Sequence, residues 1–156
     1  MRIAIDLDGT LVRGNYPFPL EKVAQEYEDI FLSRECLRAG ICELYSYIKE
    51  SNYEFWIYTF SFRKIEEIEC LFKKYNVQLD GIINYMIHKG RISEIDLEEL
   101  RWIQKYPPAF GIDLLVDDLE EVKLDGDRLK FEVLLLKEKD LHWVEKVIDK
   151  LNELGK

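Results

Sequence analysis

Short runs of apolar residues alternate along the chain with longer segments in which apolar residues recur every three or four positions. The short runs are typical of strands buried on both faces of a sheet, and the periodic segments are typical of amphipathic helices. We expect strands at residues 2–6, 55–58, 82–86, 112–116 and 131–136, helices at 37–50, 61–75 and after 140, and a weaker helix or loop at 93–104. Strands that alternate with helices predict a three-layer α/β/α domain of Rossmann-like type, with a central, mostly parallel sheet.

Polar residues beside these segments predict where the elements begin or turn. Ser61, Ser93 and Asp140 precede helical patterns and are candidate N-caps. The dipeptide Asp-Gly at 125–126 is typical of tight turns, so we expect a turn there. A short acidic helix is expected within residues 20–31.

Composition is that of one folded domain over residues 1–156. Hydrophobic residues make up 47% of the chain and charged residues 34%, a balance that excludes global disorder. No apolar run approaches the roughly 18 residues that a membrane span needs. Asp6 and Asp8 interrupt the first apolar run, where a secretory leader needs a continuous one. We therefore expect no membrane partner.

Charge and cysteine content narrow the partners and the compartment. The chain carries 31 acidic and 22 basic residues, a formal net charge of −9, which makes long nucleic acid a poor partner. The three cysteines show no Cys-x-x-Cys spacing and lie in or directly beside predicted helices. We expect them to be reduced thiols in a cytoplasmic protein.

Acidic and hydroxyl residues follow three of the predicted strands. Asp-Leu-Asp-Gly-Thr at 6–10 follows the first strand, Thr59 follows the second, and Asp117 and Asp118 follow the strand at 112–116. If these strands are parallel neighbours, their carboxyl ends meet at one edge of the sheet, where α/β proteins bind ligands. Carboxylates gathered there need a cation among them, and a few hard oxygen ligands favour Mg²⁺. A metal, a hydroxyl and a lysine around a carboxylate suit phosphoryl transfer.

The run Asp-Leu-Asp-Gly-Thr-Leu at 6–11, placed after a buried strand, resembles the signature of the haloacid dehalogenase (HAD) superfamily. Thr59, a later lysine and the pair Asp117-Asp118 extend the resemblance in the same order. It implies a HAD-like fold and a Mg²⁺-dependent phosphatase that forms an aspartyl-phosphate. Its substrate would be a phosphorylated small molecule or a phosphoprotein. The short connections on either side of Thr59 leave little room for a cap domain, so we expect a nearly capless core.

The resemblance implies a role for each matching residue. Asp6 would be the nucleophile, and Asp8 would be the general acid and then the general base. Thr59 would hydrogen-bond the transferring phosphoryl group. The Asp6 carboxylate and the Asp8 backbone carbonyl would bind Mg²⁺, and Asp118, or Asp117 with it, would complete the metal site. We favour Asp118 as the direct ligand.

The catalytic lysine and the substrate contacts are less closely defined. Lys105 is our choice for the cation that offsets the charge of nucleophile and phosphate, and Lys89 is the alternative. Residues expected to contact the substrate are Gly9, Thr10, Ser61 and Arg63, together with Tyr16 and Phe18 in the loop at 13–19. Gly9 would also permit the tight turn that leaves the strand.

Other classes of protein share parts of this pattern. Receiver-type signalling domains place the acidic pair first and the phosphoacceptor later, which is the reverse of the order here. An EF-hand loop needs glycine at its sixth position, where Leu11 stands. A catalytically idle scaffold and a phosphotransferase of the same superfamily remain alternatives to the phosphatase. Asp8 favours hydrolases and transferases over dehalogenases, which lack an acid at that position.

Overall fold

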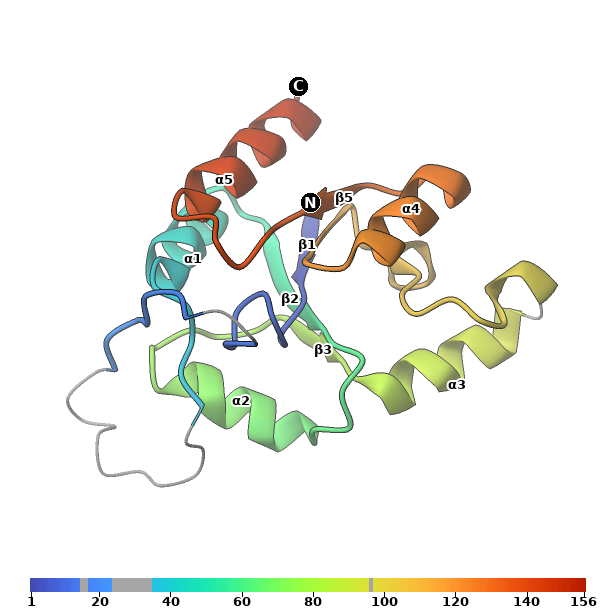
Figure 1. The fold of residues 1–156 in the computed structure, drawn as a ribbon, viewed down its shortest axis with the longest axis horizontal. Coiled ribbons are helices and arrows are strands. Elements are labelled where there is room, and N and C mark those ends of the chain that lie inside the picture. Colours follow the sequence, from blue (N-terminus) through green and yellow to red (C-terminus); the bar gives the residue numbers. More distant parts are fainter. Residues whose placement is uncertain (15–16, 24–34, 96) are drawn as a thin grey trace.

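The computed structural model describes residues 1–14, 17–23, 35–95 and 97–156 (Figure 1). Its strands are β1 (Arg2–Ile5), β2 (Glu54–Tyr58), β3 (Gly81–Ile83), β4 (Leu114–Asp117) and β5 (Val133–Leu135). They form one sheet in the order β3-β2-β1-β4-β5, and every neighbouring pair is parallel. The helices are α1 (Ile41–Glu50), α2 (Ile65–Lys73), α3 (Tyr85–Ile95), α4 (Glu120–Leu129) and α5 (Trp143–Leu154), with short 3₁₀ helices at Glu98–Leu100 and Pro107–Phe110.

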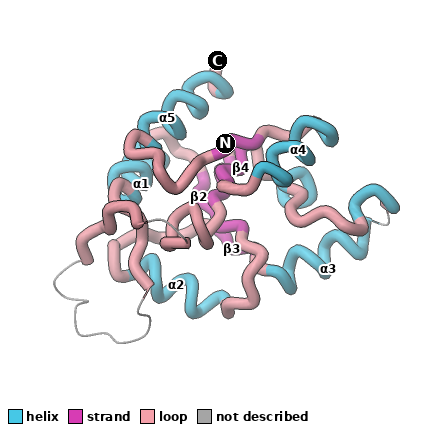
Figure 2. The backbone as a smooth tube through the Cα atoms, viewed as in Figure 1, coloured by secondary structure: helices cyan, strands magenta, loops and turns pink. Residues whose placement is uncertain are grey.

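Helices cover both faces of the sheet, as the alternation of side chains along β1 requires (Figures 1 and 2). Ile3 and Ile5 lie in one buried cluster with apolar residues of α1, α2 and α5. Ala4 lies in a second cluster, with Ile92 of α3 and Val122 of α4. The predicted three-layer α/β fold is therefore confirmed, and the sheet is parallel throughout.

The predicted helix starts are wrong in each case. Ser61 was expected to cap a helix, but α2 begins four residues later, with Lys64 at its N-cap, whose backbone N–H donates to the Glu67 carboxylate at 2.9 Å. Asp140 was expected to cap the last helix, but His142 is the N-cap of α5. Ser93 lies inside α3, where its hydroxyl donates to the Gly90 carbonyl at 2.7 Å. Hydroxyl and carboxylate residues near a helix start do not by themselves select the first helical residue.

Tertiary contacts also explain why the start of α1 and the turn predicted at 125–126 differ from the structure. Leu37 pairs with Val12, and Arg38 with Leu20, as isolated β-bridges, so α1 starts at Ile41 rather than at 37. The turn expected at 125–126 is wrong, because both residues lie within α4. A Cβ on Gly126 would stand 2.7 Å from Val133 Cγ2, so the glycine allows α4 to approach β5 closely.

The predicted strand at 82–86 is wrong in its second half, because α3 begins within it. Residues 82–86 were expected to be extended, but β3 ends at Ile83 and Tyr85 is the first residue of α3. The Asn84 side chain accepts a hydrogen bond from the Ile87 backbone N–H at 3.1 Å, which is the arrangement of an N-cap. The short apolar run therefore divides between a strand and a helix at Asn84.

Three further expectations concern residues 20–31, membrane spans and the cysteines. Of the acidic helix expected at 20–31, residues 24–31 lie outside the described part of the chain, as does Tyr16. Among the described residues, every helix is too short or too polar to cross a bilayer. None of the three cysteines, all of which lie in the described part of the chain, forms a disulfide.

Candidate active site

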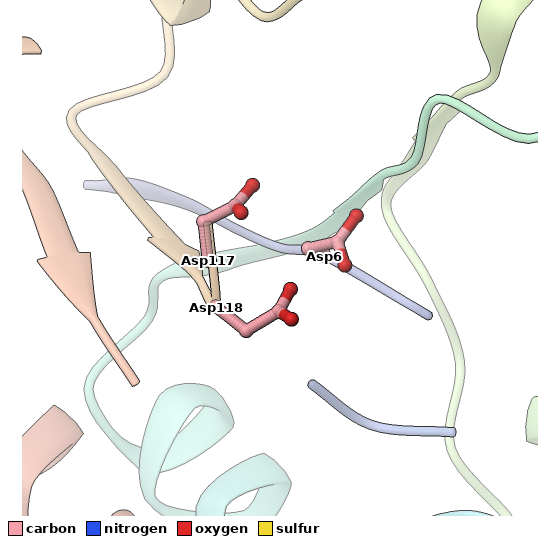
Figure 3. A group of neighbouring side chains, drawn as sticks. All are labelled: Asp6, Asp117 and Asp118. Carbon is pink, nitrogen blue, oxygen red and sulfur yellow. The ribbon is translucent and has the colours of Figure 1, made fainter. Parts of the chain in front are cut away.

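The predicted convergence of strand ends is confirmed. Asp6 follows β1, Thr59 follows β2, and Asp117 ends β4, and β1 pairs with both of the other strands. The Asp6 N–H donates to the Val116 carbonyl at 2.9 Å, which extends the ladder to the first acidic residue. Figure 3 shows Asp6 beside Asp117 and Asp118, at the ends of β1 and β4. The strand order reverses between β1 and β4, and such a switch point is where parallel sheets bind ligands.

A buried lysine lies between two of these acids. Lys105 Nζ donates to Asp117 Oδ2 at 2.6 Å and also to Asp6 Oδ1. The three side chains are almost entirely inaccessible to solvent, with exposed fractions of 1%, 0% and 8% for Lys105, Asp117 and Asp6. Lys89, the alternative, is exposed, and its ammonium lies over the Tyr85 ring. The fold thus brings Lys105, and not Lys89, to the first acidic residue.

Burial and charge act in opposite directions on these groups. Burial raises the pKa of the Asp6 carboxyl, Lys105 lowers it and Asp117 raises it, and the result is a pKa of about 7. Burial opposes the charged form of Lys105, but the Asp6 and Asp117 carboxylates outweigh burial and raise the pKa of its ammonium. Burial, and then Asp117, raise the pKa of Asp118. The site therefore holds excess negative charge at a cost that a further cation would relieve.

The oxygens that remain suit a divalent cation. Asp6, Asp117 and Asp118 each offer an oxygen within 4.8 Å of the others. Asp117 uses both of its oxygens elsewhere, since Oδ2 accepts from Lys105 and Oδ1 accepts from the Leu119 N–H at 3.0 Å. Asp118 is only half buried. Of the two acids at the end of β4, Asp118 is accordingly better placed to bind a metal and Asp117 to hold Lys105. Asp6 also accepts from Lys105, but unlike Asp117 it lines the pocket together with Asp118.

The turn after β1 packs its backbone against Asp118. Gly9 has a φ of 83°, in the left-handed region, and a Cβ there would lie 2.5 Å from Asp118 Oδ2. Thr10 is fully buried, and its hydroxyl lies 3.4 Å from Asp6 Oδ2 and 3.3 Å from Asp118 Oδ1. The side chain of Thr10, which was expected to contact the substrate, faces the acids and links β1 to the end of β4.

A second cation holds Asp8. Arg63 donates to both carboxylate oxygens of Asp8, at 2.6 and 2.7 Å, and to both oxygens of Glu35, at 2.6 and 3.2 Å. The two-pronged geometry of the guanidinium matches a carboxylate, and it matches a phosphate equally well. The hydrogen bond to Asp8 is the main reason why the pKa of Arg63 is raised.

An open pocket of about 230 Å³ lies at this edge of the sheet. Its lining residues are Asp6, Asp8, Thr59, Phe60, Ser61, Lys105, Asp118 and Leu119. Thr59 is buried, and its hydroxyl oxygen accepts from the Ser61 N–H at 3.2 Å. Phe18 was expected to contact the substrate, and this is wrong: its ring is buried outside the pocket lining and lies 4.6 Å from the Arg38 guanidinium. Arg38 holds the ring there by a cation–π contact.

Sequence reasoning missed the groups that support Lys105. The Tyr58 hydroxyl accepts from the Tyr106 N–H at 2.9 Å and donates to His88 Nδ1 at 2.6 Å. Burial lowers the pKa of His88 to about 4, so the imidazole is a neutral acceptor at pH 7. This chain of bonds fixes the backbone next to Lys105. His88 itself is buried. No local motif marks Glu35 or Tyr58 in advance.

Comparison with known proteins supports the fold and does not assign a family. No protein-family profile matches the chain, and no curated protein does. One solved chain, from a structure of the Pnkp1/Rnl/Hen1 complex, is 21% identical with a TM-score of 0.51, and the match covers 89% of this chain and 46% of that one. A chain from a structure of the Pnkp1/Rnl/Hen1 RNA repair complex is 18% identical with a TM-score of 0.49, over 86% of this chain and 41% of that one. The present chain spans less than half the length of either, and the first of these likenesses supports the α/β fold alone.

Proposed function

We propose that this chain is a Mg²⁺-dependent phosphomonoesterase of HAD type that works through an aspartyl-phosphate on Asp6. The observation that carries the proposal is the buried bridge of Lys105 between Asp6 and Asp117, at the carboxyl ends of adjacent parallel strands. The bridge lies beside an open pocket that also contains Asp8 and Thr59. Such an arrangement places an ammonium and a hydroxyl donor where phosphoryl charge develops, and its excess of carboxylates leaves a place for a metal cation.

Each residue has a defined part in the two steps. A carboxylate oxygen of Asp6 attacks phosphorus, the bond from phosphorus to the leaving oxygen breaks, and Asp8 gives that oxygen its proton. Asp8 then takes a proton from water, which attacks the phosphoryl group on Asp6 and releases inorganic phosphate. Thr59 donates to the phosphoryl oxygens, and Lys105 offsets the charge of nucleophile and phosphate.

The metal would be held by the carboxylates of Asp6 and Asp118 and by the backbone carbonyl of Asp8. The Asp6 and Asp118 carboxylates each offer an oxygen within 4.8 Å of the other, and such hard oxygen ligands suit Mg²⁺. When bound, Mg²⁺ neutralises charge on the phosphoryl oxygens. Gly9 leaves the space that this approach of the turn to Asp118 needs.

Arg63 would contribute by exchanging partners. The N–H groups of its guanidinium donate to the carboxylates of Asp8 and Glu35, and the phosphate oxygens of a substrate would compete for the same N–H groups. A substrate that draws Arg63 away also frees Asp8 to carry a proton. Ser61, whose backbone lies in the pocket beside Thr59, would complete the cradle.

The test is hydrolysis of a generic aryl phosphate by the wild type, Asp6→Asn and Asp8→Asn, with and without Mg²⁺. We expect metal-dependent release of phosphate from the wild type. Asp6→Asn should abolish it, and Asp8→Asn should lower it by about 10²–10⁴-fold, the usual contribution of a general acid–base group. Transfer of the phosphoryl group to an added alcohol in preference to water would favour the phosphotransferase. A folded wild type with no turnover under any divalent metal would favour the idle scaffold.

A further inference from the structure

Three aromatic rings follow one another outward from the pocket. Phe60 lines the pocket, and its ring stands edge-on to Tyr85 with the centroids 4.9 Å apart. The Tyr85 ring in turn lies 4.5 Å from the Phe62 ring. Phe62 is 73% exposed although its ring packs against that of Tyr85, and so large an exposed area is unusual for a phenylalanine. We call Phe60, Tyr85 and Phe62 the aromatic row.

The aromatic row is held in place by a ring contact to His88 and by hydrogen bonds between its two backbone segments. Phe60 stands edge-on to the buried His88 ring at 5.2 Å. The Tyr85 N–H donates to the Ser61 carbonyl at 3.1 Å, and the Asn84 side chain donates to the Arg63 carbonyl at 3.0 Å. The loop that carries Phe62 is thereby tied to the start of α3. A rigid apolar surface loses little conformational entropy when a ligand covers it.

We propose that the aromatic row stacks against a planar ring in the leaving group of the substrate, which is a small phosphomonoester of the nucleoside monophosphate kind. This proposal rests on the proposed function, because it places the phosphate of the substrate among Asp6, Asp8 and Lys105. An exposed apolar surface beside a polar pocket marks a binding site for a ligand with one charged end and one apolar end. Ring stacking on aromatic side chains accepts any flat base.

The position of Phe62 indicates how the planar ring of the substrate is linked to the phosphate. Phe60 borders the pocket, whereas the more exposed Phe62 lies two residues further along the loop and outside the lining. Because Phe60 lines the pocket and Phe62 does not, we expect a ring bonded directly to the phosphate oxygen to meet Phe60, and a ring separated from the phosphate by a sugar to extend to Phe62. The net charge of −9 favours a mononucleotide over a polymer with many phosphates.

The experiment compares adenosine 5′-monophosphate with ribose 5-phosphate, which present the same primary phosphate ester and differ only in the base. We expect kcat/KM to be about tenfold higher for the nucleotide, the usual effect of one stacked base. Phe62→Ala and Phe62→Leu should bring the ratio of the two constants close to one, and Phe62→Tyr should keep it. The control is Leu141→Ala, because Leu141 is also 73% exposed and does not line the pocket.

Failure of this proposal differs from failure of the phosphatase. Equal hydrolysis of both compounds would overturn the stacking role of the aromatic row and leave the proposed phosphatase activity intact. If neither is hydrolysed, calorimetric binding decides: tighter binding of the nucleotide that Phe62→Ala removes supports the aromatic row, and equal binding overturns it. A Phe62→Ala effect on phosphotyrosine but not on the nucleotide would mean a directly attached ring and overturn the assignment. Preference for a phosphorylated oligonucleotide over the mononucleotide would overturn it in favour of a polymer.

Discussion

Two cations hold acidic side chains at the same edge of the sheet, in opposite surroundings. Lys105 lies between Asp6 and Asp117 with 1% of its side chain exposed, and Arg63 lies between Asp8 and Glu35 with 22% exposed. Asp8 itself is 51% exposed, whereas Asp117 is not exposed at all. Each cation faces two carboxylates, so the number of charges does not distinguish the two clusters.

Access to water distinguishes them. In the buried cluster the two carboxylates have no solvent to replace their cation, so loss of Lys105 leaves buried negative charge uncompensated. In the exposed cluster water and salt replace a lost partner at little cost. The first arrangement suits a permanent scaffold for the nucleophile. The second suits a contact that opens when a phosphate arrives.

The comparison is tested most strongly by replacing each cation with methionine. Lys105→Met should lower the free energy of unfolding by about 3–5 kcal/mol, because Asp6 and Asp117 are left buried without their cation. Arg63→Met should lower it by no more than about 1 kcal/mol, because its partners are solvated. Denaturant unfolding of both variants without divalent metal measures the difference.

A second variant separates lost charge from lost packing at position 105. Adding Asp117→Asn to Lys105→Met should recover part of the loss, since one of the two stranded carboxylates is then neutral. Equal destabilisation by Lys105→Met and Arg63→Met would contradict the distinction between the clusters.

The pH dependence of stability should be specific to the buried cluster. The pKa of the Asp6 carboxyl is raised from 3.8 to about 7 in the folded chain, so between about pH 4 and pH 7 the folded chain holds a proton that the unfolded chain has lost. The free energy of unfolding therefore falls as the pH rises through that window. Asp6→Asn removes the titration, so in metal-free buffer it should become more stable than the wild type as the pH rises, by at most roughly 4 kcal/mol at neutral pH.

Thermal unfolding of both proteins from pH 4 to pH 8 checks this expectation. Asp8→Asn is the matched control, because it removes an acid from the same turn but from the solvated cluster. If the gap between Asp6→Asn and the wild type did not change with pH, burial would not govern the ionisation of Asp6.

The smallest expected effect is that of salt on the exposed cluster. Raising the sodium chloride concentration should shrink the stability difference between the wild type and Arg63→Met by about a few tenths of a kcal/mol, because mobile ions screen solvated pairs. The difference between the wild type and Lys105→Met should change less, since buried pairs are screened little. Denaturant titrations at low and high salt measure both. Equal salt sensitivity would place the two cations in similar surroundings.

Sequence patterns predicted the strands better than the helix starts. A buried strand needs only a short apolar run, and β1, β2, β4 and β5 lie where such runs occur. Helix starts depend on contacts made from a distance, as at Ile41, where the preceding residues are held in bridges to Val12 and Leu20. The glycine at 126 was assigned to a turn because its close approach to β5 has no local signal.

The candidate site divides in the same way. Sequence alone placed Asp6, Thr59 and Asp117 at one edge, because residues that follow parallel strands must share it. It also indicated the tight turn at Gly9. These inferences need only the order of the elements and the direction of the strands.

Tertiary structure alone decided which lysine meets Asp6, which cation holds Asp8, and that three rings line up beside the pocket. Lys105 lies in irregular chain between two 3₁₀ helices, and Glu35 precedes α1 in a loop, so periodicity says nothing about where either side chain points. Such contacts depend on distances between segments far apart in the chain. They are set by how the helices pack on the sheet, and only the folded structure contains that information.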